Sequence, residues 1–227
     1  MRTALRSAAV LTISLLVAGT AALAANNEAI KRNNFGAELV KQGRLDDAVT
    51  EFRSAIQSDP RYAAAHANLA YTYDRLGRVD EAIAVYKDTV ALDPKNAVAF
   101  NNLGVLYVKK DAYEDAIQAF EQGLKADPAN ALLQQNLAGA KKNKDILKER
   151  EVRIAEARKK ADAAPKDPQA AYDVARVYAS LDMRDQAFEW LETSLRLGLD
   201  DTKFVREDPV LLGLRRDPRF ARLMEGR

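Results

Sequence analysis

The sequence predicts an all-α protein built as a stack of repeated helical hairpins. One observation is a fixed period: Asp-Pro pairs beginning at Asp59, Asp93 and Asp127 stand 34 residues apart. A second observation is that the blocks between these pairs carry similar residues at matching internal positions. A period of this length is the signature of a repeat protein, in which each unit stacks on its neighbour and cannot bury its apolar face alone.

The blocks share large, small and aromatic residues at matching positions. The aligned sets, in order along the block, are Phe35, Leu69 and Leu103; Gly36, Ala70 and Gly104; Leu39, Tyr73 and Tyr107; Ala48, Ala82 and Ala116; and Phe52, Tyr86 and Phe120. Small residues let two helices approach closely, and an aromatic side chain fills the space beside them. Each block is therefore predicted to be two helices packed against each other.

Turn residues separate the two helices of each block. Gly43 and Gly77 suit the left-handed backbone conformation that ends a helix, and Asp111 stands at the matching place in the third block. Aspartate tolerates that conformation less well than glycine but better than most residues. The proline at the end of each block is expected to stop one helix and to open the next.

These features resemble the tetratricopeptide repeat, a helix–turn–helix unit. The resemblance covers residues 29–62, 63–96 and 97–130. It departs from the family where an early tryptophan is common, because Arg32, His66 and Phe100 stand there. The resemblance implies a right-handed helical-repeat solenoid with an inner groove, in which the fold is specified but the partner is not.

The first residues have the layout of a secretory signal peptide. Two arginines precede an apolar run from Ala8 to Ala18, and small residues before Ala25 supply a cleavage site. We expect cleavage after Ala24, so that the signal peptide is residues 1–24, with cleavage after Ala25 as the alternative. An uncleaved anchor is disfavoured because the run is short for a span of about 20 residues.

Composition limits the classes of function. The chain has no cysteine, which excludes disulfides, thiolate metal sites and a cysteine nucleophile. It has 35 basic and 33 acidic residues, and two of the basic ones belong to the predicted signal peptide, so the processed chain is expected to be neutral. A nucleic-acid binder would show a basic footprint. We therefore expect an exported protein, periplasmic or else secreted, without nucleic acid, cofactor or metal and without stable membrane insertion after cleavage.

After residue 130 the repeat pattern continues for half a unit and then fails. Asn136 and Leu137 are in register, but Arg150 stands where the small alanine of the second helix belongs. Residues 141–163 are charged and contain neither Gly nor Pro, so we predict one long helix or a turnless degenerate repeat within residues 131–167. Such a charged helix is commonly a solvated face, and a docking site for an acidic partner or a membrane surface is the alternative.

The pattern restarts as a fourth, looser repeat over residues 168–201. In residues 202–227, two Asp-Pro pairs, beginning at Asp208 and Asp217, each combine a helix-capping side chain with a helix-opening proline. We expect short helices that cover the end of the last repeat, because terminal repeats need a cap. The apolar residues predicted to form this cover are Leu211, Leu212, Leu214, Phe220 and Leu223.

A row of asparagines is the strongest candidate for a binding surface. Its members fall at one repeat position, 34 residues apart: Asn34, Asn68, Asn102 and Asn136. In the family this position faces the concave groove. Because an amide both donates and accepts hydrogen bonds, the row can hold a peptide by its backbone. The alternative is that asparagine, common at this position in the family, bonds only to neighbouring backbone.

Further groove candidates follow from the resemblance. Asn33 and Asn101 lie one residue earlier, and Tyr71 and Arg75 lie about one turn later in the second repeat. The family's clamp for a C-terminal carboxylate uses a lysine among these positions. The first repeats have no lysine at the matching place, and Lys109 in the third is the nearest basic residue.

The sequence contains no motif typical of a catalytic site. His66, the only histidine, is expected to pack, because a lone histidine makes neither a metal cluster nor a triad. We therefore predict no catalytic residues and a non-catalytic adaptor of the bacterial envelope, which binds an extended or helical segment of another protein in its groove. The alternative is a structural spacer or self-assembling subunit of a larger envelope complex, a homo-oligomer included, that makes contact through residues 141–163 and the tail.

Overall fold

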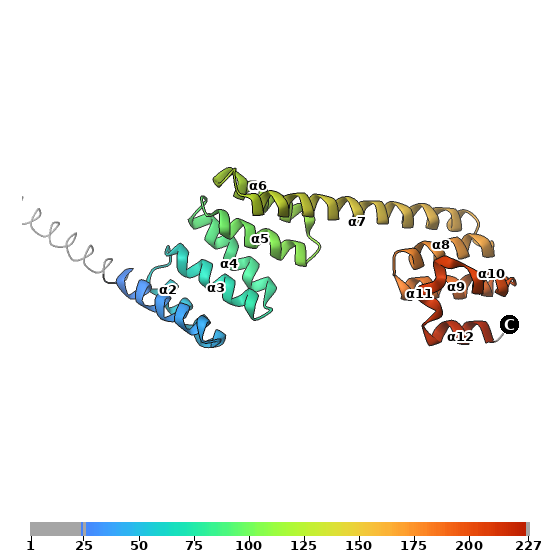
Figure 1. The fold of residues 1–227 in the computed structure, drawn as a ribbon, viewed down its shortest axis with the longest axis horizontal. Coiled ribbons are helices and arrows are strands. Elements are labelled where there is room, and N and C mark those ends of the chain that lie inside the picture. The colour runs from blue at the N-terminus through green and yellow to red at the C-terminus, as the bar shows by residue number, and fades with distance from the viewer. Residues whose placement is uncertain (1–23, 25, 226–227) are drawn as a thin grey trace, which may run out of the picture. The chain divides into compact units, whose positions relative to one another are not determined.

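The computed structural model describes residue 24 and residues 26–225, and all regular structure within them is helical (Figure 1). Apart from Ala24, the predicted signal peptide lies outside the described residues, as does the alternative cleavage position at Ala25. The described chain divides after Asn143 into two compact units. No helix among the described residues is long and apolar enough to cross a lipid bilayer.

The first unit consists of consecutive helix pairs followed by the start of a longer helix, which confirms the predicted all-α repeat fold. The pairs are residues 26–41 with α2 (Leu45–Ser58), α3 (Ala63–Arg75) with α4 (Val79–Leu92), and α5 (Ala97–Lys109) with α6 (Tyr113–Ala126). Each second helix carries acidic residues in its first turn, where they stabilise the positive end of the helix dipole.

Small residues bring the paired helices together, as the aligned positions predict. Gly36 faces the ring of Phe52 so closely that a Cβ on the glycine would lie 2.7 Å from Cε1 of the ring. Gly104 stands in the same relation to Phe120. The matching alanines of the second helices are fully buried: Ala48, Ala82 and Ala116.

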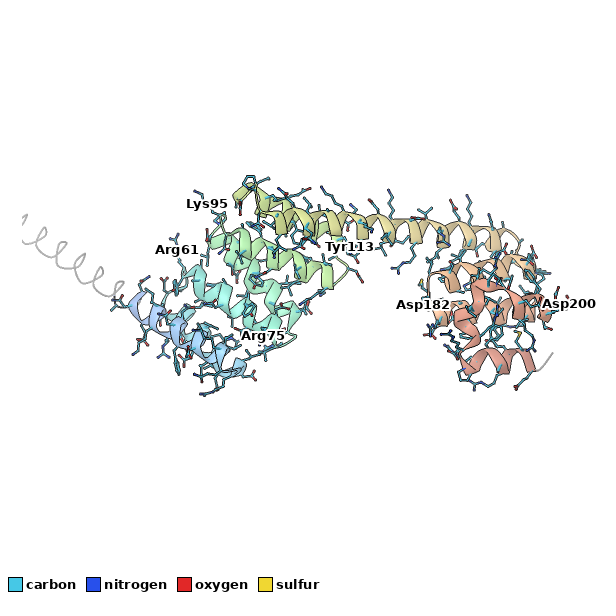
Figure 2. All side chains as sticks on the ribbon, viewed as in Figure 1. Arg61, Arg75, Lys95, Tyr113, Asp182 and Asp200 are labelled. Carbon is cyan, nitrogen blue, oxygen red and sulfur yellow. The ribbon has the colours of Figure 1, made fainter. Side chains whose placement is uncertain are left out.

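The turns inside the hairpins have the predicted left-handed residues. Gly43 and Gly77 have φ of 76° and 74°, and Asp111 has φ of 56°. The turn of the fourth hairpin uses the same conformation at Asp182, which is labelled in Figure 2 and also has φ of 56°. Aspartate therefore replaces glycine in two of these turns at some cost in strain.

The prolines that end the first three repeats lie in turns and not at the start of the next helix. The Tyr62 N–H donates to the Asp59 carbonyl at 3.1 Å, which places Pro60 at the second position of a β-turn, where its fixed φ is favourable. The next helix begins only at Ala63. The prediction that these prolines open helices is thus wrong in the first unit. The matching prediction for the C-terminal residues is correct, since Pro209 and Pro218 each begin a short helix.

One continuous helix, α7 (Ala131–Ala163), follows the third pair and confirms the predicted long charged helix. The division between the two units falls inside it. Near its start, Leu133 and Ala140 are buried in the first unit, and near its end Ala161 is buried in the second. Each end of α7 therefore belongs to a different core.

The second unit combines a fourth helix pair with a helical cap. The pair is α8 (Pro168–Ser180) and α9 (Arg184–Arg196), and the cap is α10 (Thr202–Glu207), the 3₁₀ helix η1 (Pro209–Leu211), α11 (Leu212–Arg215) and α12 (Pro218–Glu225). Leu211 and Leu214 are fully buried in its core. Leu212 is exposed, so its predicted place in the cover is wrong. In a helical turn, side chains three residues apart share a face while the next residue along points elsewhere.

A buried carboxylate joins the cap to the fourth repeat. Asp208, only 4% exposed, accepts hydrogen bonds from the Tyr172 hydroxyl at 2.7 Å and the Val210 N–H at 2.8 Å. It also pairs with Arg176 at 2.8 Å. Burial and the hydrogen bond to this carboxylate raise the pKa of the Tyr172 hydroxyl, so it stays protonated and donates.

Candidate functional site

The predicted asparagines lie on the first helix of each hairpin in the first unit. We call these helices the A helices: residues 26–41, α3, α5 and residues 131–143 of α7. Neighbouring A helices contact each other directly, since Lys109 of α5 pairs with Asp74 of α3 at 2.6 Å. The surface that carries Asn34, Asn68, Asn102 and Asn136 is called the A-helix face below.

Two asparagine pairs bridge consecutive A helices. The Asn68 amide donates to Oδ1 of Asn33 at 2.8 Å, and the Asn136 amide donates to Oδ1 of Asn101 at 2.8 Å. Each pair joins residues 35 apart in the sequence. The asparagines thus bond side chain to side chain between repeats. The sequence analysis expected them to bond either to a bound peptide or to neighbouring backbone.

The third asparagine of the row is held differently, because Ala67 stands where Asn33 and Asn101 stand in their repeats. The Asn102 amide donates instead to the Tyr86 hydroxyl at 3.0 Å. Burial raises the pKa of that hydroxyl to about 12, against a weaker opposing effect of the hydrogen bond. A neutral phenol is therefore fixed beneath the A-helix face.

A hollow of about 440 Å³ opens between α3 and α5 at this point. Its lining residues are Ala67, Asn68, Tyr71, Tyr86, Asn96, Val98, Ala99 and Asn102. It brings together Asn68, Tyr71 and Asn102 from the predicted set. The short side chain of Ala67 leaves the space that an asparagine pair occupies elsewhere.

The other predicted residues lie around this hollow or beyond it. Arg75 lies beside it, with its guanidinium carbon 5.9 Å from the centre of the Tyr71 ring and Nη1 3.3 Å from the Tyr71 hydroxyl. Asn136 lines a second hollow, of about 370 Å³, between α5 and α7. Asn34 is exposed, whereas Asn33 and Asn101 serve as acceptors in the asparagine pairs.

The same face also carries a row of exposed apolar residues that the sequence analysis did not identify. Ile30, Val98 and Leu132 are all exposed, with Val98 at 66%, and each precedes an asparagine of the row by four residues. Residues four apart share one face of a helix. Their spacing is the signal that could have found them, because Ile30 and Val98 are two repeats apart and Val98 and Leu132 are one repeat apart.

The lone histidine has a structural contact. His66 is buried with Nε2 3.0 Å from the carbonyl oxygen of Pro60, so it ties α3 to the turn before it. Within the described part of the chain, no group of three or more His, Cys, Asp and Glu side chains is placed to hold a metal ion.

The comparison with family models decides what the helix pairs are. The model named Tetratricopeptide repeat matches residues 33–97 and 75–131. These residues form a tetratricopeptide-repeat domain. The match covers the A helices that carry the asparagines up to the start of α7.

Solved tetratricopeptide-repeat domains have the same fold. The first such domain of human RPAP3 is 22% identical with a TM-score of 0.51, over 55% of this chain and 98% of that one. The domain of Sgt2 from Aspergillus fumigatus is 20% identical with a TM-score of 0.51, over 54% of this chain and 82% of that one. The first domain of Spaghetti (RPAP3), bound to the HSP90 peptide SRMEEVD, is 23% identical with a TM-score of 0.50, over 52% of this chain and 93% of that one. No curated protein sequence matches the chain.

Proposed function

We propose that this chain is a non-catalytic protein-interaction module, which binds a peptide segment of a partner protein on its A-helix face. The observation that carries the proposal is the hollow between α3 and α5, where amide side chains and exposed apolar side chains lie together. Amides satisfy a peptide backbone, and Tyr71 and Val98 offer apolar contact to its side chains.

A solved domain of the same fold supports this proposal. The Spaghetti (RPAP3) domain was solved with a bound HSP90 peptide. A tetratricopeptide-repeat scaffold does not select a partner, so the surface residues of this chain must do so.

Site-specific crosslinking tests the proposal. A photo-crosslinking amino acid placed at Val98, which is exposed beside the hollow, should capture a partner protein in living cells. Capture should be lost when Asn68→Ala and Asn102→Ala are added and the chain still folds by circular dichroism. Capture that persists in this double variant would count against the A-helix face.

A second candidate function, a spacer or self-assembling subunit, is favoured by exposed apolar residues on the charged part of α7. Ile146 is 53% exposed there, and Val152 is exposed too. The same crosslinker at Ile146 separates the two functions. Crosslinks from Ile146 but none from Val98 would support the second candidate, and adducts of twice the chain mass would identify self-assembly.

We further propose that the protein is exported to the periplasm, with cleavage after Ala24. The support is the arginine-flanked apolar run from Ala8 to Ala18 and the small residues that follow it. N-terminal sequencing of the protein from the envelope fraction should begin at Ala25, or at Asn26 for the alternative site. An intact Met1 would favour the uncleaved anchor.

A further inference from the structure

The first A helix, residues 26–41, carries a stripe of exposed side chains that differ from those of the inner repeats. Its members follow one another at spacings of four and three residues, which places them on one side of the helix: Lys31, Phe35 and Glu38. All three are exposed, and Phe35 is 54% exposed. We call this set the first-helix stripe. It presents an aromatic ring to solvent between a positive and a negative charge.

The same three positions are buried in the inner repeats. The uncharged residues that occupy them are Ala65, Leu69 and Thr72 in α3, and Ala99, Leu103 and Leu106 in α5. There α3 packs against α2 of the repeat before it, and α5 packs against α4. Within the described residues no helix pair precedes residues 26–41. The first-helix stripe is therefore the stacking surface of a repeat without its neighbour.

A solubilising end of the stack explains only part of this stripe. Terminal repeats need a polar outer face, which accounts for Lys31 and Glu38. It does not account for Phe35, because an exposed aromatic side chain works against solubility and is larger than the leucines at the matching inner positions. An aromatic residue with charged residues around it is the composition of a protein–protein interface.

The charges of the stripe are ordered so that the helix complements its own reversed copy. Lys31 and Glu38 are seven residues apart, which is about 10.5 Å along the helix. When two such helices lie antiparallel about the midpoint between these residues, Lys31 of each copy faces Glu38 of the other. Phe35 is half a residue from that midpoint, so the two rings lie within about 1.5 Å of the same level.

Both charges are available for this pairing. Lys31 forms no ion pair with another described residue. Glu38 pairs with Lys41 at 3.3 Å, but both side chains are exposed, so solvent weakens this pair and Glu38 can accept a second cation. A two-fold interface needs one surface that complements itself. The first-helix stripe meets this requirement, which favours a second copy of the chain over an unrelated partner.

We propose that the first-helix stripe is a self-association surface, on which two copies of this chain pair antiparallel, with Phe35 against Phe35 and Lys31 against Glu38. This inference goes beyond the proposed function, because the stripe shares no residue with the hollow between α3 and α5. It also differs from the second candidate function, which places self-assembly on α7.

Sedimentation of the full chain over a range of concentrations, as purified from the cells that make it, tests this inference. Wild type should form a dimer, and Phe35→Ser should abolish it. Lys31→Glu and Glu38→Lys should each weaken the dimer about tenfold or more, because each places like charges opposite one another at two symmetric contacts. An equimolar mixture of these two variants should dimerise again, since each copy then meets the opposite charge on the other.

Leu212→Ser and Lys166→Glu are the matched controls, because they make the same kinds of change at exposed residues outside the first unit, and both should dimerise as wild type does. Thermal unfolding by circular dichroism shows whether each variant folds. A wild-type chain that stays monomeric would overturn the inference, as would a dimer that survives Phe35→Ser. A mixture of Lys31→Glu and Glu38→Lys that fails to dimerise would overturn the antiparallel pairing.

Crosslinking in cells separates a second copy from another partner. A photo-crosslinking aromatic amino acid in place of Phe35 should give an adduct of twice the chain mass. An adduct with a different protein, and none of twice the chain mass, would overturn the inference. The hollow between α3 and α5 is unchanged in every variant of this experiment, so its result leaves the proposed function to the crosslinking at Val98.

Discussion

Gly36 and Phe52 pack closely across the first helical hairpin, and the ring lies too near to leave room for a Cβ on residue 36. A methyl group there would come within 2.7 Å of Cε1 of a ring that is itself only 1% exposed. The same relation between Gly104 and Phe120 shows that this contact belongs to the repeat and not to one hairpin.

Gly36→Ala should lower the free energy of unfolding by about 1–2 kcal/mol, since overpacking a filled core costs more than the helix propensity of alanine returns. Denaturant unfolding followed by circular dichroism measures this change. Gly139→Ala is the control: it adds the same methyl group to a helix with open space, and should stabilise the chain by up to about 1 kcal/mol. Equal effects of the two substitutions would contradict the close contact.

The Tyr86 hydroxyl should make stability depend on alkaline pH. Its pKa is raised to about 12 in the folded chain from an ordinary value of 10.0, mainly by burial. Because the folded pKa is the higher one, its contribution is complete below pH 10 and is lost as the pH rises toward 12. Between these values wild type should lose about 2–3 kcal/mol more than Tyr86→Phe does.

Unfolding by urea at a series of pH values checks this prediction. Tyr71→Phe, at an exposed tyrosine on the same face, is the control and should follow the wild-type curve. Parallel curves for wild type and Tyr86→Phe would show that burial of the hydroxyl has no such effect.

Asp208→Ala should destabilise the second unit by about 1–3 kcal/mol, because it leaves the buried Tyr172 hydroxyl without its acceptor, while Arg176 is partly exposed to water. Amide hydrogen exchange should show faster exchange in residues 168–225 and little change in α2–α6. Asp200→Ala, at an exposed aspartate labelled in Figure 2, should leave both regions unchanged. Uniform acceleration along the whole chain would mean that the two units unfold together.

Asp182→Gly should stabilise the second unit by about 0.5–1 kcal/mol, because glycine adopts a positive φ without the strain that aspartate carries at φ of 56°. The ion pair with Arg184 would be lost, but both groups are exposed, so that loss is small. A rise of the thermal midpoint is the expected readout. The reverse exchange in the first unit, Gly77→Asp, should lower it.

The fold follows from the sequence to a large extent because its determinants are periodic. The left-handed turns at Gly43 and Asp111, and the contact of Gly36 with Phe52, all occupy positions that the 34-residue alignment marks. The charged part of α7, residues 141–163, follows from a run without Gly or Pro. The same alignment misplaces the role of Pro60, because a β-turn and a helix start both accept its φ and the sequence does not distinguish them.

The candidate site is less predictable, because it depends on departures from the repeat. The asparagine row is visible in the sequence, but its pairing with Asn33 and Asn101 requires knowing that consecutive A helices lie side by side. The hollow at Ala67 is an absence of side-chain volume, which no periodic pattern marks as functional. Leu212 shows the same limit in the cap, where the direction of a short helix decides which leucine is buried.

The register of the asparagine pairs has a consequence for how this chain can change length. Each of the two pairs joins residues 35 apart, one more than the repeat, so in both the donor of one repeat meets the acceptor of the repeat before it. Removal of residues 63–96 would bring Asn102 to the sequence distance from Asn33 that Asn68 has now, and would re-form the pair while deleting the hollow at Ala67. Loss of a few residues between Asn33 and Asn68 would instead shift that donor away from its acceptor. Whole-repeat gain or loss is therefore the route by which descendants of this protein could open or close binding positions without refolding the rest of the stack.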